Sequence, residues 1–211
     1  MTDIFIFGAS GFARETADVA ISNGYTPVFV IRDEGGSDDL SDFGGVIAEP
    51  ELSRQSGADC AIGIADVSIR RRIVDTFGPA FQFPALIHPL ASFGHRQREV
   101  AEASEGTIIC AGARFESRIT LGRFGVFNLN STICHDSIVD DFCHIAPGAN
   151  LSGYVHLHEG VWVGTGAAIN QGSPEAHRQI GRNTMIGSGA VVVQDCDADS
   201  VYVGVPARKR A

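Results

Sequence analysis

The sequence predicts a small α/β domain followed by a parallel β-helix with three faces. Two observations predict this arrangement. Residues 4–31 follow the order strand, Gly-rich turn, helix, strand, and from residue 109 onward an apolar residue recurs at every sixth position. A period of six fits neither an α-helix nor an alternating strand of ordinary length, but it suits short strands separated by turns. Each six residues then supply one face, so eighteen residues make one coil.

The apolar column runs through eleven consecutive repeats and resumes after one break. Its members are Ile109, Phe115, Leu121, Phe127, Ile133, Val139, Ile145, Leu151, Leu157, Val163 and Ile169, and then Ile180, Ile186 and Val192. We expect these side chains to stack inside the solenoid while successive coils pair as parallel strands about 4.8 Å apart. Because the frame breaks after Gln171, we expect a loop at about residues 171–179 to protrude from the coils.

We expect the first domain to span residues 1–84 and the β-helix to span residues 85–211. The expected strands are 4–7, 27–31 and 59–65, the expected helices are 12–22 and 67–77, and residues 37–45 are expected to form a surface loop. The second helix carries three arginines, 70–72, which we expect on a solvated face. Residues 94–106 are polar and out of frame, which predicts either an excursion from an early coil or a disordered loop.

The turn after the first strand is a candidate nucleotide site. It contains Gly8, Ser10 and Gly11, whose short side chains let backbone N–H groups and the helix N-terminus face a phosphate. Asp33 lies 22 residues after Gly11, where it can accept a hydrogen bond from a ribose hydroxyl. The turn lacks the full dinucleotide fingerprint, so a tight strand-to-helix turn without a ligand is the alternative.

Composition excludes several classes of function. The net charge of −9 argues against broad binding of nucleic acid or of anionic membranes. The five cysteines show no disulfide-scaffold pattern, so we interpret them as reduced packing residues. We find no secretion signal and no apolar run near the roughly 20 residues that a membrane span needs, and we therefore expect a cytoplasmic protein.

The hexads resemble the left-handed parallel β-helix of the hexapeptide-repeat acyltransferases, as does the ending from Tyr202 to Lys209. The Gly-Ala-Ser-Gly turn of a Rossmann-like first domain, the Ile-His-Pro segment at 87–89 and the His135-Asp136 pair inside a hexad resemble the NeuD/PglD group of sugar acyltransferases. The resemblance implies transfer of an acetyl group from acetyl-CoA, without a metal, to a nucleotide-linked 4-amino sugar. It also implies a homotrimer with active sites between subunits.

The resemblance assigns roles to particular residues. It implies that His135 is the general base and Asp136 its orienting partner, although relatives often have Glu there and adjacent residues on an extended chain tend to point apart. The resemblance also implies that His144 lies near the acyl-CoA thioester and that Asn128 faces the sugar. Trp162, eighteen residues after His144, is expected either as a wall of that site or as an outward packing residue at the trimer interface. Arg208 and Lys209 are expected either to meet CoA phosphates or to form a solvated tail.

Coil spacing adds predictions that are independent of the resemblance. Gly153 is eighteen residues after His135, so it leaves open space above that histidine and its N–H can serve as an oxyanion donor. Gln171 is eighteen residues further, so the loop that follows, with His177 and Arg178, should emerge on the same edge and border the substrate or CoA channel. His144 is half a coil from His135, so the two can cooperate only between subunits.

Three alternative functions remain at this stage. A sugar O-acetyltransferase of the sialic-acid type would use the same base on a hydroxyl. A γ-carbonic-anhydrase-like zinc enzyme would need three histidines converging between subunits, and the spacing of His135 and His144 does not fit that family. The third alternative is a non-catalytic β-helix that binds a sugar nucleotide. His156 and His158 fall in no motif, and we interpret them as surface residues.

Overall fold

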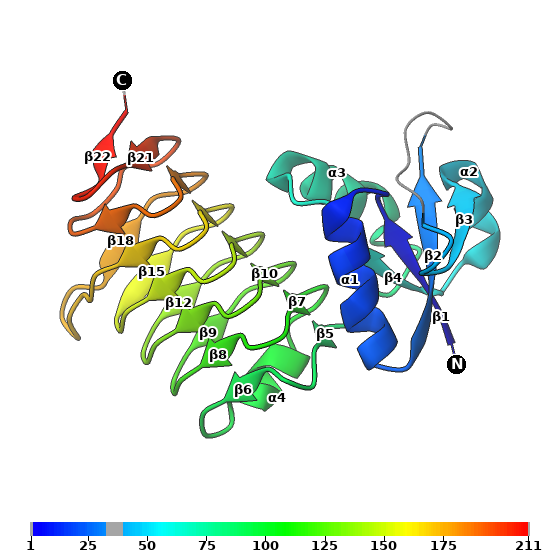
Figure 1. Ribbon diagram of the computed structural model, residues 1–211, viewed down its shortest axis with the longest axis horizontal. Coiled ribbons are helices and arrows are strands. Elements are labelled where there is room, and N and C mark those ends of the chain that lie inside the picture. The colour runs from blue at the N-terminus through cyan, green and yellow to red at the C-terminus, as the bar shows by residue number, and fades with distance from the viewer. Residues whose placement is uncertain (1, 33–39, 211) are drawn as a thin grey trace.

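The computed structural model describes residues 2–32 and 40–210, in which an α/β domain lies beside one end of a long β-helix (Figure 1). Asp33 and residues 37–39 of the expected surface loop lie outside the described residues. Within the described ranges, no helix has the length and apolar character needed to cross a membrane.

The α/β domain is built on a four-stranded parallel sheet with the strand order β3-β2-β1-β4. Its strands are β1 (Thr2–Phe7), β2 (Tyr25–Ile31), β3 (Gly45–Ala48) and β4 (Asp59–Ile62), and its helices are α1 (Gly11–Ser22), α2 (Glu49–Leu52), the 3-10 helix η1 (Ser53–Gln55) and α3 (Val67–Phe77). The expected strands and helices are confirmed, although β2 begins earlier and β4 ends earlier than expected. This strand order is that of nucleotide-binding α/β folds, in which ligands bind beyond the carboxyl ends of the strands.

The β-helix has one sheet on each of its three faces. The eight-stranded sheet contains β5 (Leu86–Ile87), β7 (Ile108–Ile109), β10 (Val126–Phe127), β13 (His144–Ile145), β16 (Trp162–Val163), β19 (Met185–Ile186), β21 (Val201–Val203) and β22 (Arg208–Lys209). The six-stranded sheet contains β6 (Ser92–Phe93), β8 (Arg114–Phe115), β11 (Thr132–Ile133), β14 (Asn150–Leu151), β17 (Ala168–Ile169) and β20 (Val191–Val192). The four-stranded sheet contains β9 (Thr120–Leu121), β12 (Ile138–Val139), β15 (Val155–Leu157) and β18 (Arg178–Ile180).

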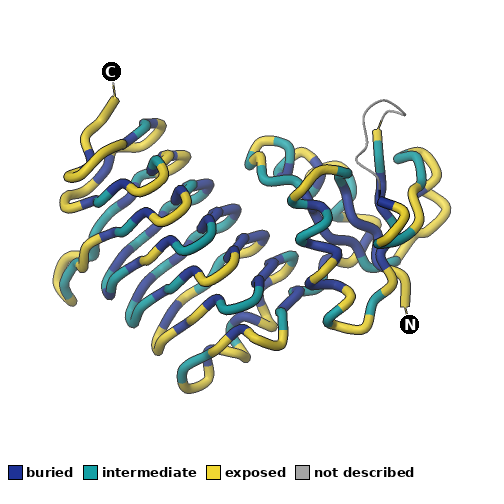
Figure 2. Tube along the Cα trace, in the orientation of Figure 1, coloured by how far each residue is buried: buried dark blue, intermediate teal, exposed yellow. Residues whose placement is uncertain are grey.

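The eighteen-residue coil is confirmed by strand register. Phe127 pairs with Ile145, and Ile133 pairs with Leu151, in parallel strands. The apolar column forms the continuous buried core of the solenoid, with only Leu121 partly exposed, and Figure 2 shows this alternation of buried and exposed positions along each coil. Burial of each such side chain contributes roughly 1.5–3 kcal/mol, which makes the column the main source of stability in this half of the chain.

Left-handed backbone conformations mark the corners of the coils, and they also recur every six residues. Residues with positive φ at these corners include Gly106, Gly112, Arg118, Phe124, Asn130, Asp136, Phe142, Gly148, Tyr154, Gly160 and Gly166. Glycine and, less readily, Asn and Asp adopt this conformation. Because of its positive φ, a corner residue points its side chain in a direction that is not available to a residue in an extended strand.

Residues 94–106 contain a helix, which agrees with the expected excursion from an early coil and not with the alternative of a disordered loop. Helix α4 (Gln97–Glu102) buries Ala101 against the apolar column, and Gln97 Oε1 accepts a hydrogen bond from the Ile119 N–H at 3.0 Å. The segment thereby covers the first coils of the solenoid, whose apolar interior would otherwise meet water.

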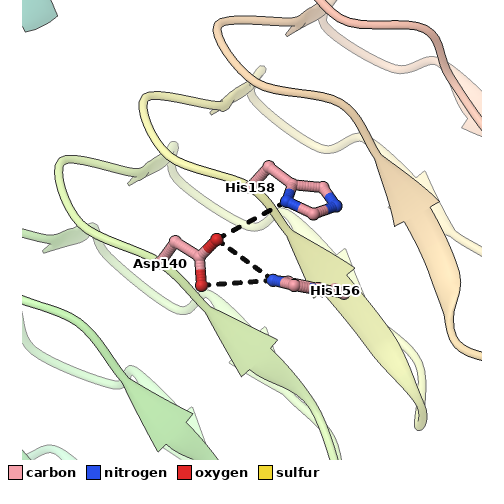
Figure 3. A group of neighbouring side chains, drawn as sticks. All are labelled: Asp140, His156 and His158. Carbon is pink, nitrogen blue, oxygen red and sulfur yellow. Dashed lines mark hydrogen bonds and ion pairs between the residues drawn. The ribbon is translucent and has the colours of Figure 1, made fainter.

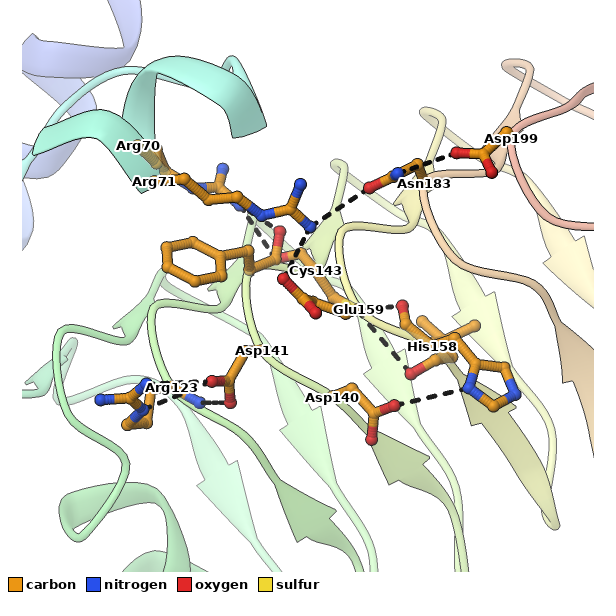
Figure 4. Close-up of polar contacts among 12 residues, drawn as sticks. Arg70, Arg71, Arg123, Asp140, Asp141, Cys143, His158, Glu159, Asn183 and Asp199 are labelled. Atoms are coloured by element: carbon orange, nitrogen blue, oxygen red, sulfur yellow. Dashed lines mark hydrogen bonds and ion pairs between the residues drawn. The ribbon is translucent and has the colours of Figure 1, made fainter. Parts of the chain in front are cut away.

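The three arginines of α3 are expected on a solvated face, but this is wrong for Arg70, which is only 1% exposed. Its guanidinium donates to the carbonyl of Ala65 at 2.9 Å and to the carbonyls of Phe142 and Cys143 in the β-helix (Figure 4). Burial lowers the pKa of Arg70 to about 10, so the side chain stays charged at neutral pH. Arg71 extends the contact by an ion pair with Glu159 at 2.8 Å. Helix α3 is therefore tied to the β-helix.

We expect Arg70→Met to lower the free energy of unfolding by about 1–3 kcal/mol, because it removes the donor to the buried carbonyl of Phe142. Thermal unfolding followed by circular dichroism measures this change. The matched control is Arg72→Met on the same helix, since Arg72 is exposed. An equal loss in both variants would contradict the assigned role of Arg70.

Candidate active site

His135 and Asp136 form a hydrogen-bonded pair at the corner between β11 and β12. Nδ1 of His135 lies 2.9 Å from Oδ2 of Asp136, and the His135 side chain is 40% exposed. The concern that adjacent residues point apart does not hold here, because Asp136 is a corner residue with a φ of 57°. Its left-handed backbone directs the carboxylate toward the imidazole, so the shorter side chain of Asp reaches His135 where relatives often have Glu.

The charge of Asp136 fixes which nitrogen of His135 is free. The hydrogen bond with His135 and, to a smaller extent, the charge of Arg118 lower the pKa of Asp136. Arg118 Nε lies 3.0 Å from Asp136 Oδ1. Because an ionised carboxylate only accepts hydrogen bonds, Nδ1 of His135 must donate, which leaves the lone pair of the neutral ring on Nε2. Nε2 is therefore the atom that can take a proton.

Gly153 lies against the ring of His135, as the coil spacing predicted. A Cβ atom placed on Gly153 would lie 2.4 Å from Cε1 and 2.7 Å from Nε2 of His135, so only glycine permits this ring position. The Gly153 carbonyl accepts a hydrogen bond from Gly172 N–H, whereas its own N–H meets no acceptor among the described residues. A free N–H donor therefore lies beside the candidate base.

The loop after Gln171 returns to the same edge, which confirms its predicted location. Leu157 pairs with Ile180 instead of with a residue eighteen positions later, so the loop adds five residues to one coil. His177 Nε2 lies 3.0 Å from the carbonyl oxygen of Asp136, and the ring of Tyr154 contacts the rings of both His135 and His177. The loop therefore forms one side of the His135 site.

Sequence analysis missed three residues of this site. Arg118 and Tyr154 stand eighteen residues before and after Asp136, so the coil spacing that found Gly153 could also have found them. Glu116 is different, because its carboxylate accepts the backbone N–H of His135 at 3.1 Å from the preceding coil. No repeat spacing signals that contact.

His144 lies on another face, in β13, where it is buried at the junction of the two domains. Its ring stacks on Trp162, with centroids 3.9 Å apart, and the tilted ring of Phe12 of α1 lies 5.8 Å away. Burial, and secondarily the charge of Arg70, lower the pKa of His144 to about 3, so the ring is neutral at physiological pH. Its Nδ1 is buried and has no hydrogen-bond partner among the described residues.

The Gly-rich turn lies on the same side of the chain as His144, because Phe12 directly follows Gly11. Gly8 has a φ of 111°, and a Cβ there would lie 2.8 Å from Ile64 Cγ1, so the turn requires glycine. Ser10 is the N-cap of α1, but its side chain makes no capping hydrogen bond, and the first turn has no acidic residue. The positive end of α1 is therefore open to an anion.

A groove continues from this side of the molecule between the start of α3 and the eight-stranded sheet. It is lined by Asp66, Ser68 and Arg71 of the first domain and by Trp162 and Met185 of the β-helix. The Asp66 carboxylate accepts the Ile69 N–H at 2.9 Å and so caps α3. The groove combines an aromatic wall with charged groups, as ligand sites commonly do.

The remaining predicted residues lie apart from His135. Asn128 is 4% exposed, and its amide donates to Glu15 of α1 at 3.1 Å. Arg208 and Lys209 are exposed on β22 at the far end of the solenoid, where Lys209 pairs with Asp197 at 3.0 Å (Figure 1). Within one chain, His144 contacts Trp162 and Phe12, which directly follows the Gly-rich turn, whereas no contact between these residues and His135 is found among the described residues.

Comparisons with known proteins find similar proteins for the first domain and for nearly the whole chain. Residues 3–77 match the family model of the PglD N-terminal domain. The chain is 28% identical to GDP-perosamine N-acetyltransferase of Escherichia coli O157:H7, over 97% of this chain and 94% of that protein.

Two solved structures show the same fold. A mutant of perosamine N-acetyltransferase from Caulobacter crescentus, in complex with CoA and GDP-perosamine, has a TM-score of 0.86 at 24% identity, covering 100% of this chain and 98% of that one. The acetyltransferase domain of PglB from Neisseria gonorrhoeae FA1090, in complex with acetyl coenzyme A, has a TM-score of 0.85 at 27% identity, covering 99% and 98%.

An α/β Rossmann-like domain followed by a left-handed parallel β-helix, the fold that these solved structures share, confirms the expected fold class. Within that fold, the chain is similar over residues 3–77 to the PglD N-terminal domain, and over nearly its whole length to amino-sugar N-acetyltransferases of the NeuD/PglD type.

We expect the buried, neutral His144 to make the protein less stable in acid. An unfolded histidine titrates near 6.5, so between pH 7 and pH 5 the unfolded chain takes up a proton that folded His144 does not. Folding stability should therefore fall by up to about 2 kcal/mol over that interval on account of this residue. Chemical denaturation at both pH values measures the change.

The variant His144→Phe keeps a ring on Trp162 but removes the titrating group, and it should show a smaller loss between pH 7 and pH 5. His95→Phe, at an exposed histidine, is the control and should keep the wild-type difference. An unchanged difference in His144→Phe would show that His144 does not titrate as its burial requires.

Proposed function

We propose that this protein transfers the acetyl group of acetyl-CoA to the amino group of a nucleotide-linked 4-amino sugar, in the cytoplasm. The observation that carries the proposal is the His135–Asp136 pair, whose free Nε2 lies beside the unbonded N–H of Gly153. A relative over nearly the full length is named as a GDP-perosamine N-acetyltransferase, and complexes of similar structures with CoA or acetyl-CoA support acetyl-CoA as co-substrate.

The chemistry is direct transfer. The sugar amine attacks the thioester carbonyl carbon and forms the new C–N bond, while Nε2 of His135 takes the proton that the nitrogen loses. The carbonyl oxygen becomes an oxyanion that accepts a hydrogen bond from the Gly153 N–H. Collapse of this tetrahedral intermediate breaks the C–S bond. The protonated His135 then returns its proton to the CoA thiolate. A positioned base of this kind contributes about 10²–10⁴-fold to the rate.

Asp136 and Arg118 support the base without touching the substrate. Asp136 holds the His135 ring by Nδ1 and stabilises the positive charge that the ring gains during the reaction. Arg118 keeps the carboxylate ionised and in position. Arg118 is therefore a positioning residue in this mechanism.

The α/β domain would hold the nucleotide. The open N-terminus of α1, with Gly8, Ser10 and Gly11, suits the diphosphate, and Asp33 is proposed to meet the ribose. Asn128, which holds Glu15 near this end of α1, is proposed to face the sugar. We assign the acetyl-CoA contacts to His144 and Trp162, and the phosphate contacts to Arg208 and Lys209.

The complete site is proposed to form between subunits of a homotrimer. The nucleotide turn and His144 share one face of a chain, whereas His135 lies at a corner that does not meet that face. A neighbouring chain that presents its His135 corner to this face would join base, thioester site and sugar.

The proposed function is tested with acetyl-CoA and a panel of UDP-, GDP- and dTDP-linked 4-amino sugars, with products identified by mass spectrometry. We expect one nucleotide sugar to gain an acetyl mass, and His135→Ala to reduce that rate on the order of 10²–10⁴-fold. His95→Ala is the control for loss of a surface histidine. Acetylation only of sugars with a hydroxyl acceptor, or equal rates in His135→Ala, would contradict the proposal.

The shared site is tested by co-expressing His135→Ala and His144→Phe chains. If neighbouring chains supply the two histidines, randomly mixed trimers should recover about a quarter of the wild-type activity, because a quarter of the interfaces then carry both intact residues. Each variant alone should stay impaired. If one chain supplies both histidines, mixing should restore nothing.

A further inference from the structure

Asp140, His156 and His158 lie together on the four-stranded face of the solenoid (Figure 3). His156 lies in β15 and His158 directly follows that strand, so the two side chains, two residues apart, point outward on one face. Asp140 follows β12 one coil earlier, eighteen residues before His158. Both histidines lie at the surface, as expected, but they contact each other and Asp140.

The distances in this cluster suit a shared cation. His156 Nε2 lies 3.1 Å from both oxygens of Asp140, and His158 Nδ1 lies 3.6 Å from Asp140 Oδ2. All three candidate ligand atoms lie within 4.8 Å of one another. Two ligands of one tetrahedral zinc ion are roughly 3.3 Å apart, given Zn–N and Zn–O distances near 2.0–2.1 Å.

Hydrogen bonds from the next coil orient the ring of His158. The amide of Gln179 donates through Nε2 to the carbonyl of His177 at 3.1 Å, so its Oε1 faces His158 Nε2 at 2.8 Å as an acceptor. His158 must then donate from Nε2, and a neutral ring has its lone pair on Nδ1, which faces the Asp140 carboxylate. A lone pair and a carboxylate repel each other unless a cation or a proton lies between them.

The local charges favour a cation at Asp140. Among the carboxylates that line the adjacent hollow, Asp141 pairs with Arg123 and Glu159 pairs with Arg71, as Figure 4 shows. The ion-pair contacts of Asp140 within the described part of the chain are to the two histidines alone. Asp140 thus keeps a negative charge that no arginine balances.

We propose that Asp140, His156 and His158 bind a divalent transition-metal cation of the zinc type. Two imidazoles and one carboxylate match the ligand preference of zinc, whereas Mg²⁺ and Ca²⁺ prefer oxygen ligands. Gln179 supplies the outer hydrogen bond that typically fixes a metal-binding histidine. The partial exposure of all three side chains leaves room for water as a further ligand.

The site has a structural consequence for the catalytic edge. The chain of contacts runs from His158 to Gln179, from Gln179 to the His177 carbonyl, and from the His177 ring to the Asp136 carbonyl. A bound cation would hold Asp140 and His158 of two successive coils together and stabilise the loop beside His135. The proposed role is therefore structural, and it stands apart from the transfer chemistry.

The test uses untagged, chelator-treated full-length protein titrated with ZnCl₂ in a calorimeter. We expect saturable binding of one Zn²⁺ per chain and a rise in melting temperature on adding Zn²⁺. Asp140→Asn and His158→Ala should each weaken binding at least about 100-fold, and Gln179→Leu should weaken it about 10–100-fold. His95→Ala should bind as the wild type does.

Circular dichroism identifies variants that fail to fold, and Asp140→Asn, which keeps the side-chain shape, provides the decisive comparison if His158→Ala unfolds. The proposal is overturned if wild-type protein shows no saturable binding. It is also overturned if folded Asp140→Asn binds Zn²⁺ as tightly as wild type. The Asp140 carboxylate would then not bind the metal, and its contact with the histidines would be a hydrogen bond only. Neither result depends on acetyl transfer, so the proposed function stands or fails separately.

Discussion

Stacking of residues eighteen apart is the constraint on which the rest of the structure depends. Each coil has almost no contacts of its own, so it is stable only when its apolar residues lie on those of the coils before and after it. A slip of one residue would turn the inward side chains, such as Ile133 and Leu151, outward into water. The same register places His135 over Gly153 and sets Asp136 between Arg118 and Tyr154, so the core and the candidate active site share one origin.

Polar contacts and shared apolar packing together join the two domains. Arg70 reaches from α3 to backbone carbonyls of the β-helix, while Phe12, His144 and Trp162 fill the same junction with stacked rings. Arg70 is charged and buried, and this helps to keep His144 neutral. A neutral, dry imidazole next to an aromatic wall suits contact with a thioester, which carries no charge. The junction therefore sets both the mutual position of the domains and the electrostatics of one half of the proposed site.

The candidate active-site residues lie at a corner of the solenoid, because that is where side chains leave the regular stack. Asp136 adopts a left-handed conformation at a corner, and the inserted loop with His177 leaves the coils near it. The cluster of Asp140, His156 and His158 lies one face further along, and Gln179 connects it to the same loop. Two polar groups on neighbouring faces are thus linked through a single insertion in the repeat.

The sequence by itself determined what depends on period. The hexads predicted the three faces, the coil length, the site of the inserted loop and the position of Gly153, because regular repeats fix which residues stack. Only the tertiary structure decided the burial of Arg70, the helix over Gln97–Glu102, the place of His144 against Phe12, and the pairing of Asp136 with His135. These features depend on contacts between segments far apart in the chain, or on the backbone angles of a single corner residue. A local pattern of apolar residues encodes neither.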